Sequence, residues 1–541
     1  MRNEALRAGA LLTVCLIALA HAAPATTYSR DQLIEDVREL VRVIEQTHPD
    51  PFVRCGGRIA YYRVFQEVIA SIPEAGATLD EFVHIVRPLI GVVGDGHTGI
   101  CYDYPVNVSR PGGVPLSLGV IEESLYVSGV RHSDDPDLIG ARLLSVEGVP
   151  LAELCLRQRR VMGAENRYHV LRLLAGKWLY YKPFLRDILP EWEDERSLRV
   201  ALELPTGEIR EVEYASPTYM ARMEEPSSCV DPPQTGASGF VWTFWDADRT
   251  TAYLRVDHMS YYREAYEIWR AAGSRDVSDE ELAAIPSATE SFRELVIEMR
   301  AAGTETLIVD LRQNEGGHSL MADILLNFLY PREVFLAAQT HHVAAGGGTI
   351  RRYSEQYFAG LPNESIEDFA GAGAVPLAVG EYDFSAEFTD PAKRACLLGQ
   401  EGTPAFLSDW YRLAPTFYAE YLSEEYAGHY TPENVLVVTT ATTYSSGFTL
   451  AEYLYLAGAT LVGTPSGQSA NCYGEIIWWE LSNTGLAGGV SGTQYIIFPE
   501  DAELGQVLPV HYPLTYEKLA SYGFDPNASL RYALEIAGTA R

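Results

Sequence analysis

The most constraining feature of this sequence is a set of apolar runs whose spacing alternates between that of a strand and that of a helix. Residues 435–440 (VLVVTT) and 460–463 (TLVG) read as buried strands, and residues 446–457 between them have helical spacing. Strand, helix and strand in this order form a βαβ unit, which requires a parallel sheet. Residues 306–312 (TLIVDLR) form another nearly continuous apolar run, as expected for a strand covered on both faces. The sequence therefore predicts an α/β fold.

The rest of the chain divides by local pattern into further segments. Residues 23–110 have apolar residues at helical spacing and are predicted to form a helical N-terminal region. Residues 111–225 hold short apolar runs split by turn residues, which indicates a small β-rich domain. Residues 226–239 are rich in Pro, Ser and Gly and read as a linker to the α/β core at residues 240–541. Within the core, residues 331–434 form a long insert, predicted to be a lid or specificity element.

The N-terminus has the pattern of a secretory signal peptide. Residues 1–22 begin with positive charge, continue as an apolar run and end on a small-x-small cleavage motif. We therefore expect the mature chain to be exported to a periplasm or secreted. No other segment is apolar for long enough to cross a membrane. Six cysteines follow the leader, and in an exported chain they permit disulfides, of which Cys55 with Cys101 is the pair that we predict.

Charge and missing motifs disfavour several classes of function. The formal net charge is −32, and nucleic-acid binding would call for a basic face. The chain has no HExxH, P-loop, GxGxxG or GxSxG motif, which removes most support for a metalloprotease, a nucleotide enzyme or an ordinary α/β-hydrolase. The cysteine spacing includes no CxxC, so a metal cluster is not expected.

Three short motifs carry groups suited to nucleophilic catalysis. Ser445 in TYSSG lies where a buried strand meets a helix, whose free N–H groups favour a developing anion; serine is also a common helix N-cap. Gly316 and Gly317 in DLRQNEGGH follow a buried strand and suit either an oxyanion hole or a plain turn. His97 in GDGHT is suited to proton transfer, although a lone histidine is more often a surface or capping residue. Each motif alone thus has a purely structural reading.

In combination and in this order, the motifs resemble the tail-specific, or C-terminal-processing, serine peptidase family, and more closely its branch that includes the tricorn core. GDGHT resembles the histidine loop of the family and DLRQNEGG its glycine-bearing strand end. TYSSG, followed by LVGTPSGQSANCYGE, resembles the nucleophile turn. The stretch LIGARLLSVEGVPL is similar to the PDZ-like domain of the family. The resemblance implies a crotonase/ClpP-like core with a parallel sheet, and a PDZ-like domain at residues 111–225.

The resemblance also implies catalytic roles. Ser445 would be the nucleophile, aligned by Tyr444, with Ser446 as the alternative if the register slips by one. His97 would be the general base, because no lysine lies between Lys393 and Lys518 to form the serine–lysine pair of another branch. Such a mechanism requires no metal or cofactor.

The resemblance further implies an oxyanion hole, whereas no motif fixes the third catalytic residue. The N–H of Gly316 or Gly317, with that of Ser446, would form the oxyanion hole. Glu475 is chosen to orient His97, and Glu503 is the rival. Asp95 lies too near His97 in the chain to be the carboxylate that orients the His97 ring, and we predict that it forms the turn of this loop.

We therefore expect an exported serine endopeptidase that acts on proteins or peptides, which a PDZ-like domain recruits at the loop of residues 117–120. The alternative is a catalytically inactive homologue that binds a small apolar ligand or a peptide. A weaker option is a scaffold that acts through the PDZ-like domain alone. Neither nucleic-acid binding nor a membrane span after signal removal is expected, and the sequence does not indicate the oligomeric state.

Overall fold

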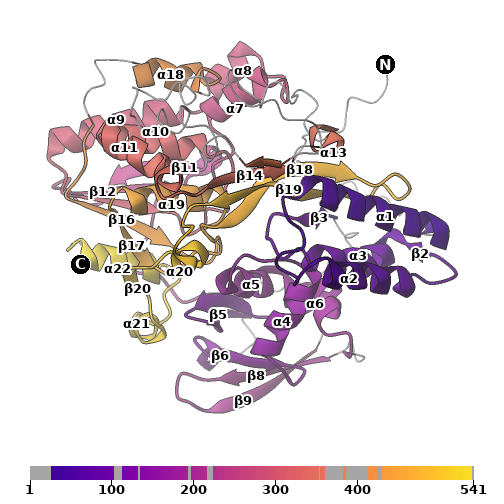
Figure 1. Ribbon diagram of the computed structural model, residues 1–541. Helices are drawn as coiled ribbons and strands as arrows, with labels where there is room; N and C mark the ends of the chain where they lie inside the picture. The colour runs from indigo at the N-terminus through magenta and orange to yellow at the C-terminus, as the bar shows by residue number, and fades with distance from the viewer. Residues whose placement is uncertain are drawn as a thin grey trace.

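The structure is a computed structural model of the 541-residue chain, shown as a ribbon in Figure 1. It describes residues 26–102, 112–131, 135–192, 197–215, 223–352, 354–359, 382–384, 411–422 and 429–538. The predicted signal peptide, residues 1–22, lies outside the described residues. Most of the predicted insert, residues 331–434, lies outside them as well.

The α/β core is built on a six-stranded sheet, in which the predicted strands pair in parallel. Its order is β11-β12-β13-β16-β17-β20, and only the β11–β12 pair is antiparallel. The strands are β11 (Phe240–Phe244), β12 (Thr251–Val256), β13 (Thr306–Asp310), β16 (Asn434–Thr439), β17 (Thr460–Gly463) and β20 (Tyr512–Pro513). The predicted α/β fold is thereby confirmed.

Helices cover both faces of this sheet, which explains why its strands are apolar throughout. On one face lie α9 (Ala288–Ala302), α10 (Leu320–Leu329) and α19 (Ser446–Leu456), and on the other lies α22 (Ala528–Ile536) (Figure 1). All five residues of β13 are buried. The helix predicted from residues 446–457 is α19, so the carboxyl end of β16 leads directly into it.

A second sheet links the core to the N-terminal region. Its path is β15-β14-β19-β18, with a short strand, β3, added beside β19. The strands are β3 (Gly99–Cys101), β14 (Gly348–Arg352), β15 (Tyr382–Phe384), β18 (Cys472–Glu480) and β19 (Ala487–Ile496). Because β3 follows the GDGHT loop, its pairing with residues 487–489 of β19 brings that loop back to the core. In Figure 1, β18 and β19 run beside α1 (Arg30–Thr47).

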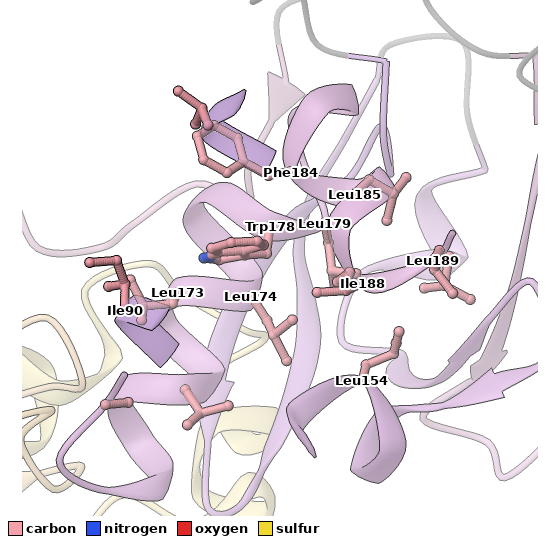
Figure 2. Close-up of a cluster of buried hydrophobic side chains, with 14 of the residues drawn as sticks. Ile90, Leu154, Leu173, Leu174, Trp178, Leu179, Phe184, Leu185, Ile188 and Leu189 are labelled. Atoms are coloured by element: carbon pink, nitrogen blue, oxygen red, sulfur yellow. The ribbon is translucent and has the colours of Figure 1, made fainter. Parts of the chain in front are cut away.

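The N-terminal helices and the β-rich segment share one hydrophobic core. The helix α3 (Leu79–Gly91) packs against both α2 (Arg58–Ser71) and α4 (Leu151–Val161), and α4 belongs to the β-rich segment. Figure 2 shows the centre of this packing, where Ile90 of α3 lies in one cluster with Leu154 of α4 and with side chains of residues 173–189. This common core fixes the ends of α3 and α4 relative to each other.

The segment predicted to be a small β-rich domain contains an antiparallel sheet with an α-helical insertion. Its strands are β4 (Ser117–Ile121), β5 (Ser124–Arg131), β6 (Arg142–Val146), β7 (Val149–Pro150), β8 (Ser197–Glu203), β9 (Ile209–Ala215) and β10 (Met223–Glu224). Between β7 and β8 lie α4, α5 (Arg167–Leu173), a π-helical turn at Leu174–Trp178 and α6 (Lys182–Ile188). The sequence did not predict these helices.

Cys55 and Cys101, predicted to pair, form no disulfide with each other.

Candidate active site

Ser445 occupies a tight turn between β16 and α19. Its φ of 50° and ψ of −128° are unfavourable for a residue with a side chain, and such strain is concentrated at functional sites. The surrounding structure holds this conformation: the backbone N–H of Ser445 donates to Oε1 of Gln468 at 3.2 Å, and that of Tyr444 donates to the carbonyl of Asn314 at 2.9 Å. The turn therefore presents the Ser445 hydroxyl at the N-terminus of a buried helix.

His97 reaches this hydroxyl from the N-terminal region. Its Nε2 lies 3.2 Å from Oγ of Ser445, although the two residues are 348 positions apart. Asp95 shapes the loop as predicted for a turn former, because its Oδ1 accepts the backbone N–H groups of His97 at 2.8 Å and Thr98 at 2.7 Å. The structure thus brings together the two side chains that the sequence proposed as nucleophile and base.

Asp95 also anchors the histidine loop in the protein interior. Its carboxylate accepts the hydroxyl of Ser491 at 2.8 Å and contacts Nε2 of His48 at 3.1 Å. Nδ1 of His48 accepts the backbone N–H of Asp50 at 3.1 Å, which leaves the Nε2 proton for Asp95. Burial of Asp95 raises the pKa of its carboxyl, but the contacts with His48 and Thr98 outweigh burial and lower it to about 2. Asp95 is therefore a buried anion that ties the loop to β19.

The carboxylate beside His97 is Glu165, which the sequence analysis did not identify. Oε1 of Glu165 lies 3.4 Å from Nδ1 of His97, within ion-pair distance but longer than a strong hydrogen bond. Its Oε2 accepts the hydroxyl of Tyr444 at 2.6 Å and lies 3.3 Å from Nδ1 of His169. Tyr444 stacks on the His97 ring, with ring centroids 5.0 Å apart. Tyr444 thus contacts both the base and its carboxylate.

The predicted third residue, Glu475, is bound by other side chains. Its carboxylate is bound by Arg351 at 3.0 Å and by the hydroxyl of Tyr495 at 3.1 Å, so its charge is already balanced on β14 and β19. The rival, Glu503, lies exposed at the start of α20 (Ala502–Gln506), and its N–H donates to Asp501. Among the described residues, Glu165 is the carboxylate recorded in contact with His97.

Close approach of glycines explains how Glu165 reaches the histidine loop. A Cβ at Gly163 would lie 2.2 Å from the carbonyl oxygen of Asp95, so only glycine lets the α4–α5 turn pack on that loop. A Cβ at Gly96 would lie 2.2 Å from the Tyr444 hydroxyl and 2.7 Å from Oε2 of Glu165. Neither glycine forms a recognisable motif with Glu165. The sequence offers no signal for this contact beyond the glycine that precedes the histidine.

The electrostatics favour a charged His97 beside a charged Glu165. Burial alone lowers the pKa of His97, but contacts with Glu165 and the charge of Asp95 outweigh burial and raise it above the usual value. Burial raises the pKa of Glu165, and contacts with His169 and His97 reverse that effect and hold it well below the usual value. Burial lowers the pKa of His169, which favours its neutral form. An imidazolium formed at His97 therefore faces a carboxylate in a water-poor site.

The predicted oxyanion donors lie against the nucleophile, and the structure distinguishes between them. Gly316 has a φ of +113°, and a Cβ there would lie 2.6 Å from Cβ of Ser445. The N–H of Gly316 is already donated to Oδ1 of Asn314 at 2.9 Å. Among the described residues, no acceptor is recorded for the N–H of Gly317 or Ser446. These two amides are therefore the available oxyanion donors.

Ser446, the alternative nucleophile, makes a different contact. Its hydroxyl donates to the carbonyl of Gly317 at 2.7 Å, whereas Ser445 is the serine next to His97.

In the described part of the chain, no group of three or more His, Cys, Asp or Glu side chains is placed to hold a metal ion. The same part of the chain contains no helix that is long and apolar enough to cross a membrane.

Comparison with known families decides the class of this protein. Residues 250–474 match the sequence model of peptidase family S41. The α/β core of the chain therefore carries a segment with the sequence pattern of peptidase family S41. The protein is accordingly a serine-type peptidase, and the predicted resemblance to the tail-specific family is confirmed. The matched S41 segment contains Gly316, Gly317 and Ser445 but neither His97 nor Glu165, so the contacts of those two residues rest on the tertiary structure.

Solved structures of mature CPAF share the fold of this peptidase at low sequence identity. Mature CPAF aligns with a TM-score of 0.53 and 15% identity over 95% of this chain and 99% of that one. Mature CPAF complexed with lactacystin gives a TM-score of 0.51 and 14% identity over 94% and 98%. The photosystem II D1 C-terminal processing protease gives a TM-score of 0.37 and 12% identity over 91% of this chain and 95% of that one, which is too low a score to indicate a shared fold. No curated protein sequence matches this chain.

Proposed function

We propose that this S41 peptidase hydrolyses peptide bonds through Ser445, His97 and Glu165. Oγ of Ser445 attacks the peptide carbonyl carbon while its proton passes to Nε2 of His97. Glu165 stabilises the imidazolium, and the N–H groups of Gly317 and Ser446 bind the oxyanion. His97 then donates the proton to the leaving amine. A water molecule, deprotonated by His97, attacks the acyl-enzyme, and the acid product leaves as Ser445 regains its proton.

One observation carries this proposal: a strained serine, a histidine and a buried carboxylate from three distant segments meet in one place. Nε2 of His97 lies 3.2 Å from Oγ of Ser445, and Nδ1 lies 3.4 Å from Glu165. Two free amides lie beside the serine at the N-terminus of α19. A purely structural serine N-cap would not need a base on its hydroxyl or strained dihedral angles.

We further propose that the β-rich segment recruits extended peptide ends to this site. A cavity of about 500 Å³ lies between β4 and the core, and it is lined by Leu118 and Gly119 on one side and by Arg312 and Thr442 on the other. An extended chain added along β4 would run toward the nucleophile turn, which begins directly after Thr442. Substrates with a free C-terminus should then be cleaved faster than the same substrates with an amidated C-terminus.

Export is the remaining part of the proposal, and it rests on the pattern of residues 1–22. Expression of the full chain in a bacterial host, followed by cell fractionation and N-terminal sequencing, tests it. A mature protein that begins close to residue 23 and is recovered outside the cytoplasm supports export. An uncleaved cytoplasmic protein contradicts it.

Covalent labelling tests the mechanism directly. A fluorophosphonate probe should label the wild type at Ser445, and Ser445→Ala should abolish labelling, whereas Ser446→Ala should retain it. His97→Gln should slow labelling strongly, because the hydroxyl loses its base. Hydrolysis of a fluorogenic peptide library should follow the same order. A folded wild type that is neither labelled nor hydrolytic would refute the proposal, and binding of an apolar ligand would then favour the carrier alternative.

A further inference from the structure

A second, larger cavity is not lined by Ser445 or by His97. Its volume is about 1280 Å³, above the range of most small-molecule pockets. Three parts of the molecule form its walls. The first is the loop after α1 with the middle of α2 and the end of α3, and the second is α4 and the α4–α5 turn with the end of α6. The third consists of core residues between Ser469 and Gln506. One wall includes Glu165 itself, so the cavity borders the carboxylate that contacts His97.

The charges at this cavity do not balance. Its acidic lining residues are largely paired: Glu153 and Glu191 bind Arg157 at 3.0 and 2.6 Å, and Asp187 binds Arg87 at 2.9 Å. The acidic lining residues that remain are Glu67 and, in the triad, Glu165. By contrast, three arginines that line the cavity have no carboxylate of the described residues within ion-pair distance, namely Arg54, Arg159 and Arg160. A basic rim thus occurs in a chain whose net charge is −32.

Two of these arginines are close enough to repel each other. Arg54 is held in place, because its Nη1 donates to the carbonyl of Gly94 at 2.9 Å and its guanidinium lies over the Tyr473 ring. Burial, and then the positive charge of Arg54, lower the pKa of Arg159. A bound anion would relieve this repulsion, and a planar guanidinium pair is well suited to a carboxylate.

The interior of the cavity has a second feature that indicates a ligand. Ser469 lines the cavity and is 1% exposed, and its hydroxyl has no hydrogen-bond partner in the described structure. Buried polar groups are nearly always paired, so this hydroxyl is available to a bound group. Apolar residues line the space as well, among them Val64, Val92 and Ile188. The cavity therefore combines a basic rim, apolar walls and a free buried hydroxyl.

We propose that this cavity binds a short apolar peptide through its free carboxylate, which lies between Arg54, Arg159 and Arg160. Such a peptide has the chemistry of a cleavage product of an apolar segment. Since the wall includes the turn that carries Glu165, occupancy is expected to change the turnover rate; this coupling, unlike the binding, rests on the proposed function of Glu165. The proposed recruitment groove beside β4 is a separate cavity with different lining residues.

Cys55 offers a local readout of binding. It lines this cavity and is partly buried, whereas Cys229 is exposed on another part of the molecule and serves as an internal reference. The Ser445→Ala enzyme, which cannot hydrolyse the probe, is incubated with an apolar hexapeptide and then pulsed with iodoacetamide. Mass spectrometry follows each cysteine separately. The free-acid peptide should slow alkylation of Cys55 at least threefold and leave the alkylation rate of Cys229 unchanged. The amidated peptide should give the same protection of Cys55 only at concentrations about tenfold higher.

Variants that remove the charge of the arginines test whether these side chains are needed for the protection of Cys55. Arg159→Gln with Arg160→Gln should raise the peptide concentration needed for protection by about tenfold or more, because both guanidinium groups line the cavity where the carboxylate is proposed to bind. Arg38→Gln, an exposed position on α1, is the matched control and should change nothing. Equal protection by acid and amide peptides, or unchanged protection in the double variant, would overturn the proposal. Protection of Cys55 without any change in wild-type turnover would overturn only the coupling to Glu165.

Discussion

Replacement of Glu165 by glutamine tests the assignment of the third catalytic residue. The side chain keeps its size, and its carbonyl oxygen can still accept the Tyr444 hydroxyl, so the fold should survive. What is lost is the negative charge that faces the imidazolium formed when Ser445 attacks. At 3.4 Å and an effective dielectric constant of about 20, that attraction is about 5 kcal/mol, which corresponds to a fall in kcat of roughly 10³- to 10⁴-fold.

The assay is the rate of acylation by a fluorophosphonate, followed in single turnover so that chemistry is observed rather than product release. Glu475→Gln and Glu503→Gln are the matched controls, because the first carboxylate is bound by Arg351 and the second is exposed. Both should acylate within about threefold of the wild type. Thermal unfolding of each variant checks the fold. If Glu165→Gln reacts normally while Glu503→Gln or Glu475→Gln loses the reaction, the assignment fails.

Further predictions concern pH, the glycine turn and the buried Asp95. The base must be neutral, and the pKa of His97 is raised, so the acidic limb of kcat/KM should lie above pH 6.5 and move to lower pH in Glu165→Gln; a pH–rate profile with no such movement would contradict this. Gly316→Ala should slow fluorophosphonate labelling by roughly 10²-fold with an unchanged circular dichroism spectrum, because its Cβ would meet Ser445 at 2.6 Å. Asp95→Asn should lower the free energy of unfolding by about 3–5 kcal/mol at pH 7 in urea titrations. Since the pKa of Asp95 falls from 3.8 to about 2 on folding, its stabilisation is present above pH 3.8, and the deficit of the variant should shrink as the pH falls toward 2.

The local sequence was sufficient where chemistry and backbone conformation are encoded over a few residues. Apolar runs predicted the strands β13, β16 and β17, because strands covered on both faces have few polar positions. Apolar residues at helical spacing predicted α19. The turn at Ser445 and the loop of His97 were found for a similar reason, since glycines and small polar residues follow a buried element in each case. These signals depend on neighbours along the chain.

Contacts between distant segments were decided only by the tertiary structure. Glu165 is 279 positions from Tyr444, and its position follows from the packing of α3 against α4 and from the absence of a side chain at Gly96 and Gly163. Glu475, the predicted third residue, is bound by Arg351 of β14, a partner that no local pattern predicts. The sequence by itself determined which residues could react. Packing determined which carboxylate they meet, because a buried charge requires partners that arrive from other parts of the fold.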